Sequence, residues 1–133
     1  MLCDFYSLFP SQLKKISGWP RGKSKQWYLV QTLPNDFEEL PNTKRVFYQL
    51  KAIQHTALMY LEAKGIVKIT AMPNKQVQLI GDAVPEKIRL MLEEDSLRNS
   101  DYFKLIVEQL SHQTLNGKSG LKMKTGLMEF LYD

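Results

Sequence analysis

The sequence is poor in the residues that build disulfides, thiolate metal sites and histidine-dependent catalytic sites. Its 133 residues include one cysteine, Cys3, and two histidines, His55 and His112. A single thiol cannot form an internal disulfide, and these three side chains match no zinc-binding pattern. We therefore expect neither a metal nor a cofactor, and we interpret Cys3 as a small apolar residue.

Long hydrophobic runs are also missing from the chain. No apolar stretch is long enough to cross a bilayer, and residues 1–10 lack the basic start and apolar centre of a signal peptide. Hydrophobic residues make up 44% of the chain and charged residues 24%, close to the averages of globular domains. This composition predicts one cooperative domain over residues 1–133, located in the cytoplasm and without a membrane partner.

The patterns of the common catalytic sites are incomplete. Two Gly-Lys-Ser triplets, at residues 22–24 and 117–119, lack the first glycine of a phosphate-binding loop, because Ser17 and His112 stand where it is required. Neither triplet is expected to follow a buried strand and open a helix. No nucleophile-elbow pattern is present, and His55 falls within a long expected helix. We therefore expect that this chain is not an enzyme, and a small hydrolase or nuclease is the weaker hypothesis.

Acidic residues are absent from residues 11–25, although the formal net charge of the whole chain is only +4. Clustered cations bind nucleic acid because they release its condensed counterions, so this basic segment is a candidate DNA contact. A solvated basic loop is the alternative interpretation. The candidate DNA-binding residues are Lys14, Lys15, Arg21, Lys23 and Lys25, with Lys75 at the tip of the hairpin described next.

The most regular pattern in the sequence predicts a helix over residues 43–64. Asn42 and Thr43 can cap its first turn, and Gly65 can adopt the left-handed conformation that ends it. Residues 66–70 and 76–80 favour strands, and residues 71–75 carry turn chemistry, so a hairpin should follow the helix. Its apolar residues recur at steps of three and four and should form one buried face, comprising Val46, Leu50, Ile53, Ala57, Tyr60 and Leu61.

The remaining segments complete the predicted architecture. Residues 26–32 have the composition of a strand, Pro85 should open a further helix, Asn99 or Ser100 should cap the next, and Thr125 should cap a last one. We predict a mainly α fold with a small β-hairpin (α+β), in which residues 1–41 form an N-terminal extension packed on a winged-helix-like core with additional C-terminal helices. Both termini are apolar.

The apolar terminal segments must dock on their own domain or be covered by another subunit. The candidate partner-binding residues are Phe5, Phe9, Leu127, Phe130 and Tyr132.

Two stretches resemble a known family of proteins. Residues 47–54, continuing to Ala57 and to residues 64–66, resemble the central helix of small middle components of ABC-three-component systems. The tail, with residues 120–122, 125–127 and 130–132, is similar to the end of those subunits. Such subunits accompany an SMC-like or Rad50-like ATPase and an effector, often a nuclease, in Lamassu-type bacterial defence against phages and plasmids.

The resemblance implies a non-catalytic accessory subunit that bridges the ATPase to the effector, with double-stranded DNA as a further candidate partner. The alternative is a free-standing winged-helix regulator of transcription that binds DNA through this chain alone. The long helix offers Lys44, Arg45, Lys51 and Lys64 to a nucleic acid, but it also carries Glu62 and lacks a dense set of base-reading side chains. Sequence-specific recognition is therefore not expected.

Overall fold

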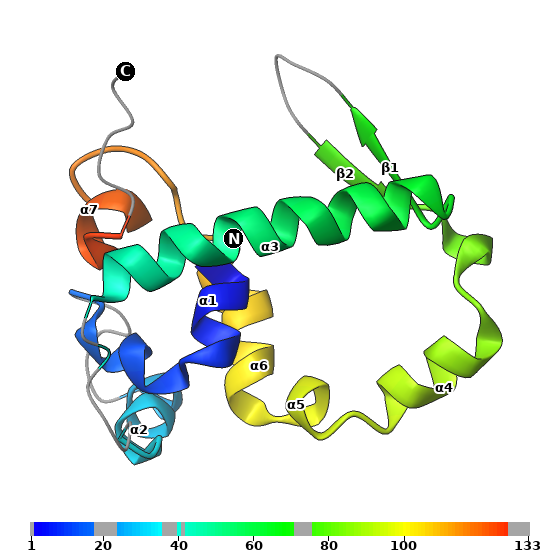
Figure 1. Cartoon of the computed structure of the whole chain (residues 1–133). Coiled ribbons are helices and arrows are strands. Elements are labelled where there is room, and N and C mark those ends of the chain that lie inside the picture. The colour runs from blue at the N-terminus through cyan, green and yellow to red at the C-terminus, as the bar shows by residue number, and fades with distance from the viewer. Residues whose placement is uncertain (1, 18–23, 36–39, 41, 71–75, 128–133) are drawn as a thin grey trace, which may run out of the picture.

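The computed structural model describes residues 2–17, 24–35, 40, 42–70 and 76–127, and shows a small helical body with one long helix running past it (Figure 1). Apart from one hairpin, every element in these described ranges is helical. In chain order the elements are α1 (Leu2–Leu8), the 3-10 helix η1 (Pro10–Lys15), α2 (Lys25–Thr32), α3 (Thr43–Ala63), β1 (Val67–Thr70), β2 (Gln76–Leu79), the 3-10 helix η2 (Gly81–Ala83), α4 (Glu86–Glu93), α5 (Ser96–Asn99), α6 (Asp101–Leu105), the π-helical turn η3 (Ile106–Leu110) and α7 (Leu121–Thr125). The prediction of a mainly α fold with a small antiparallel hairpin is confirmed, whereas the winged-helix-like core and the domain division stay predictions.

The hydrophobic core lies in the body, where the two ends of the described chain meet. Its centre is aromatic: the Phe5 ring contacts Tyr6, Phe9 and Phe47 with centroid separations of 5.2, 5.2 and 5.7 Å. The buried apolar residues of this core come from α1, η1, α2, the start of α3, α6, η3 and α7, and comprise Leu2, Phe5, Tyr6, Leu13, Ile16, Val30, Leu33, Phe47, Leu105, Ile106, Leu110, Leu121 and Leu127.

Residues 25–32 form a helix, so the predicted strand at residues 26–32 is wrong. Ser24 caps this helix, since its hydroxyl accepts a hydrogen bond from the Trp27 amide at 3.2 Å. Val30 is buried and Leu29 packs against the core, while Tyr28 is 53% exposed. Packing of one side of the helix against the body determines the structure of this segment. The β-branched and aromatic composition does not, because strand preference depends on packing context. Ser24 ends the first Gly-Lys-Ser triplet, so that triplet leads into a helix, but none of the described elements before it is a strand.

The predicted long helix is present, and both of its end signals are used. The Asn42 side chain accepts a hydrogen bond from the Arg45 amide at 2.9 Å. At the other end, Gly65 has a φ of +69° and donates its amide to the Glu62 carbonyl at 2.9 Å. A 21-residue helix is about 31 Å long, and its second half runs on past the body (Figure 1).

The face of α3 that should be buried is covered only in its first half. Phe47 is buried, and Val46 and Leu50 pack against the core. Further along, Ile53 is 64% exposed and Tyr60 is 63% exposed, so the expectation of a buried face up to Leu61 is wrong for the chain by itself. The reason is geometric, because the helix continues past the last body element that could cover it (Figure 1).

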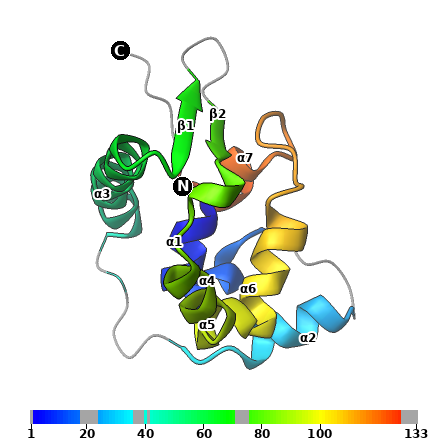
Figure 2. The ribbon, with the colours of Figure 1, turned by 90° about the vertical axis from the view of Figure 1, so that its right-hand side faces the viewer.

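After the hairpin the chain returns to the body through short helices. Pro85 precedes α4 and Ser100 caps α6 by accepting from the Phe103 amide, as predicted. Both α4 and α5 lie apart from α3 in two perpendicular views (Figures 1 and 2). Thr125 is the last residue of α7 rather than the cap of a new helix, and the predicted last helix beyond Leu127 lies outside the described residues.

Candidate interaction surfaces

The segment from residue 51 to residue 99, here called the arm, is almost uncovered. It comprises the second half of α3, the hairpin, η2, α4 and α5, and Val67 is its single buried residue among those described. Eleven of the sixteen exposed large apolar residues of the described chain belong to it: Ile53, Met59, Tyr60, Val77, Leu79, Ile80, Ile88, Leu90, Met91, Leu92 and Leu97. Soluble monomers rarely leave so much apolar surface bare, so the arm is the leading candidate for a partner-binding surface.

Helix α4 carries the clearest exposed apolar face of the arm. Ile88, Met91 and Leu92 stand at i, i+3 and i+4, which places them on one helical face, and they are 44%, 60% and 44% exposed. None of the eight residues of α4 is buried. An amphipathic helix whose apolar stripe stays about half exposed in the described chain is suited to docking in an apolar groove of another protein.

The charges of the arm are balanced. Its described residues include six Lys or Arg and six Asp or Glu. A surface that binds nucleic acid needs an excess of positive charge, since phosphate neutralisation supplies most of its affinity. The arm therefore fits a protein partner better than DNA.

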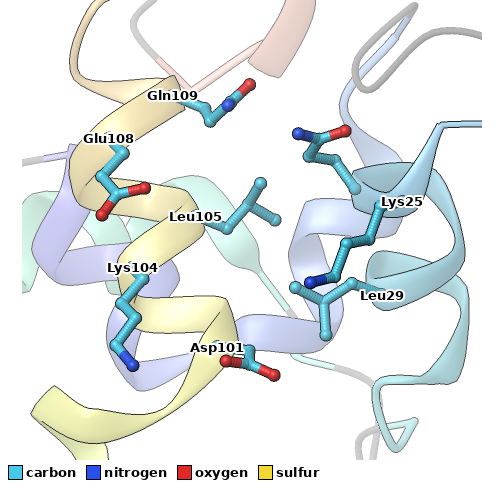
Figure 3. A pocket seen from close by; sticks show the side chains of 8 residues that line it. Lys25, Leu29, Asp101, Lys104, Leu105, Glu108 and Gln109 are labelled. Carbon is cyan, nitrogen blue, oxygen red and sulfur yellow. The ribbon is translucent and has the colours of Figure 1, made fainter.

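The body carries a shallow pocket between α2 and the α6–η3 segment. Its volume is about 230 Å³, and Figure 3 shows Leu29 and Leu105 facing each other across it, with charged side chains of both signs around the rim. The π-helical turn η3 forms part of the wall, and such turns are frequent at functional sites. The lining residues are Lys25, Gln26, Leu29, Asp101, Lys104, Leu105, Glu108 and Gln109. The pocket lies below the usual volume of small-molecule sites, about 300–1,000 Å³, and its charges do not favour an anion.

Three of the predicted DNA-binding residues, Lys14, Lys15 and Lys25, lie in the described chain. The Lys14 ammonium group donates to the Leu33 carbonyl at 2.6 Å and to Asn35 Oδ1 at 2.9 Å, so it fastens the end of α2 to η1. Lys15 is exposed on η1, and Lys25 is exposed at the start of α2, on the rim of the pocket. Arg21, Lys23 and Lys75 lie outside the described residues.

The predicted partner-binding residues at the termini lie in or against the core where they are described. Phe5 is fully buried, Leu127 is 4% exposed, and Phe9 packs against the core. These three contact their own domain, which is one of the two alternatives left open by the sequence. Phe130 and Tyr132 lie outside the described residues.

His112 and Cys3, two of the side chains considered for catalysis, lie in the described chain. His112 Nδ1 lies 3.0 Å from the Ser111 hydroxyl, but that hydroxyl donates its proton to the Val107 carbonyl, so His112 does not receive it. Burial raises the pKa of the half-buried Cys3 thiol, which lowers its fraction of reactive thiolate.

Within the described ranges, no group of three or more His, Cys, Asp or Glu residues is placed to hold a metal ion. Among the described helices, none combines the length and the apolar character needed to cross a membrane.

The exposed apolar residues of the arm are not among the site residues predicted from the sequence. The sequence shows apolar residues at helical spacing at Ile88, Met91 and Leu92. Periodicity indicates only that such a face needs to be covered, not what covers it. The exposed state of that face became apparent from the path of the chain.

The model of one protein family, described as "ABC-three component (ABC-3C) system Middle Component 5", matches the chain over residues 1–133. This range includes both the body and the arm. Among curated proteins and among solved structures, none matches this chain.

Proposed function

We propose that this chain, which belongs to the Middle Component 5 family of ABC-three component systems, is a non-catalytic subunit that bridges two partner subunits of a bacterial defence system. Membership of this family makes the chain an accessory component of a multi-component defence system and implies partner subunits. The finer proposal is that it joins an SMC-like ATPase to an effector nuclease, which together act against phages and plasmids.

The observation that carries the proposal is the exposed apolar arm. Its residues project from a body that has its own complete core, so the arm is not needed to bury that core. A bridging subunit requires such a division, because one part must hold the fold while another offers surface to a partner. In this proposal α4 and the second half of α3 provide the helical faces that dock on the partner.

The free energies of apolar burial favour a partner contact over the whole arm rather than over α4 alone. Fully burying one large apolar side chain stabilises by about 1.5–3 kcal/mol, so covering a half-exposed one is worth about 1 kcal/mol. The three residues of the α4 face would then contribute about 3 kcal/mol, which is less than the estimated cost of association, about 4–15 kcal/mol. Covering all eleven exposed residues of the arm reaches that range. The partner should therefore contact several arm elements at once.

DNA contact is a secondary part of the proposal. It would rest on Lys15 and Lys25 of the body, which are exposed and lie outside the charge-balanced arm. This placement would allow a partner on the arm and DNA on the body at the same time.

The proposal is tested by co-expressing the tagged chain with the products of adjacent genes and identifying what co-purifies after a nuclease wash. Met91→Glu should abolish recovery of the partners, because it places a carboxylate in the apolar face of α4. Glu93→Lys is the control, since it changes the charge on the side of the same exposed helix opposite to the Ile88, Met91 and Leu92 face and should leave recovery intact.

Three results would oppose this function. They are failure of the wild-type chain to recover any adjacent-gene product, full recovery by Met91→Glu, and nuclease or hydrolase activity of the purified chain alone. Circular dichroism of both variants checks that neither change unfolds the chain.

A further inference from the structure

The hairpin presents one protected edge and one open edge. Strand β1 lies on the α3 side and β2 on the far side (Figure 2). The two strands pair antiparallel in a register that joins Val67 to Leu79, Lys68 to Gln78, Ile69 to Val77 and Thr70 to Gln76. A two-stranded sheet is only marginally stable by itself, so its edges are natural places for further pairing.

The hydrogen-bonding phase of the hairpin identifies the groups that point outward. The Ile80 amide donates to the Ile66 carbonyl at 2.9 Å, so this pair belongs to the bonded set of the ladder. Bonded and non-bonded pairs alternate along antiparallel strands, which makes Gln78 a bonded residue and leaves Val77 and Leu79 non-bonded within the hairpin. The amides and carbonyls of Val77 and Leu79 therefore face the outer edge of β2.

The two edges differ in how these outward groups are satisfied. On β1, the outward amide of Ile69 donates to Glu62 Oε1 at 2.9 Å, so a side chain of the long helix occupies that edge at Ile69. On β2, no described residue bonds the outward groups of Val77 or Leu79, and all four residues of the strand are exposed. Natural edge strands are usually protected by charge, proline or a bulge, but β2 reads Gln-Val-Gln-Leu and contains neither charge nor proline.

We propose that β2 pairs antiparallel with β2 of a second copy of this chain, across a two-fold axis at Gln78, to form a four-stranded sheet. In this register Val77 of each copy faces Leu79 of the other, and both residues carry the outward amide and carbonyl. The pairing closes four backbone hydrogen bonds. It also brings the Val77 and Leu79 side chains of both copies onto one sheet face, where they are now 46% and 60% exposed.

A second copy fits this edge for reasons of symmetry and charge. The outward groups are spaced evenly about Gln78, so the edge is complementary to itself after a two-fold rotation. An isologous contact sets like charges against like charges, and the uncharged β2 strand avoids that penalty. The pairing leaves the apolar face of α4 available, and it does not depend on the proposed bridging function.

The test measures the molar mass of the purified full-length chain in solution, by sedimentation or light scattering up to about 100 μM. The same measurement is made on variants that place a charge of either sign at residue 78, on the two-fold axis. The wild type should form a species of twice the 15.5 kDa of one chain. Gln78→Lys and Gln78→Glu should each weaken the dimer about fivefold, because like charges directly opposite repel. An equimolar mixture of the two variants should restore dimerisation. The same exchange at Gln76, which does not face its own copy, should give no such restoration.

A second pair of variants tests the backbone bonds. Val77→Pro removes an outward amide without touching the ladder of the hairpin and should weaken the dimer about tenfold or more, whereas Val77→Thr keeps the amide and should leave it intact. A monomer at all concentrations, or a dimer insensitive to both the Gln78 exchange and Val77→Pro, overturns the proposal. A monomer whose capture of an adjacent-gene product is lost in Val77→Pro would likewise overturn it, and would assign the edge to a strand of that partner.

Discussion

Phe5 of α1 and Phe47 of α3 meet edge to face in the core, with ring centroids 5.7 Å apart and ring planes at 77°. Each is at most 1% exposed, and Phe47 is the single buried residue of the whole long helix. A hydrogen bond of 2.6 Å from the Gln54 amide to Asp4 Oδ2 runs between the same two helices. Phe47 is therefore the most deeply buried point at which α3, and with it the arm, is attached to the body.

We predict that Phe47→Ala destabilises the fold by about 3–5 kcal/mol, the usual cost of removing a large core aromatic. The matched control is Ile53→Ala, on the same helix but 64% exposed, which should cost about 0.5 kcal/mol or less. Urea unfolding followed by circular dichroism measures both. Equal midpoints for the two variants would show that Phe47 does not anchor α3.

Lys14 and Lys15 are neighbours in sequence, but the structure gives them different roles. Lys14→Met should destabilise the chain by about 1–2 kcal/mol, because it removes the two hydrogen bonds that hold Leu33 and Asn35 to η1. Lys15→Met, at an exposed position, should change stability by about 0.5 kcal/mol or less. Thermal unfolding of the two variants, which have the same net charge, compares them directly. A Lys14 variant as stable as the wild type would refute the assignment.

DNA binding by the body, if it contributes to function, should depend on the exposed lysines. The double variant Lys15→Glu, Lys25→Glu should weaken association with duplex DNA at low salt and reduce the slope of log K against log salt by about 1.8, as expected for two lost phosphate contacts. Its folding should be unchanged, because both side chains are exposed. Fluorescence anisotropy over a salt series gives the slope. Unaltered affinity would remove these two residues from the candidate DNA contacts.

The buried hydroxyl of Tyr6 should make the folded chain less stable at alkaline pH. Burial raises the pKa of its hydroxyl well above the ordinary value of 10.0, because the charged phenolate is disfavoured in the core. Above pH 10 the unfolded chain loses this proton while the folded chain keeps it, so the unfolded state binds fewer protons and stability falls as pH rises. The contribution is fully present below pH 10.

The measurement is urea unfolding between pH 8 and about 11, where the loss attributable to Tyr6 should approach about 1.4 kcal/mol per pH unit above the unfolded pKa. Tyr6→Phe has no proton to lose at this position and should show a shallower decline than the wild type. The two proteins differ at this one hydroxyl, so the difference between the two curves isolates Tyr6. Parallel curves would contradict the assignment.

The sequence by itself determined the local elements wherever a side chain acts on its own backbone. Asn42 and Gly65 set the ends of α3, Ser100 sets the start of α6, and the hairpin follows the long helix as expected. These signals are readable because capping bonds and left-handed glycine conformations involve residues only a few positions apart. The scarcity of cysteine and histidine could likewise be read without a structure.

Tertiary structure decided the features that depend on contacts between distant segments, namely the helical state of residues 26–32 and the extent to which α3 is buried. The strand-like residues 26–32 became helical because one side of α2 packs on the body, and strand composition carries no information about that neighbour. The apolar face of α3 illustrates the same limit. Periodicity shows that Phe47 and Ile53 belong to a helix with a face to cover, but only the path of the chain shows that the body covers the first and leaves the second bare. Burial is a relation between distant segments, or between molecules, and local sequence does not contain the partner.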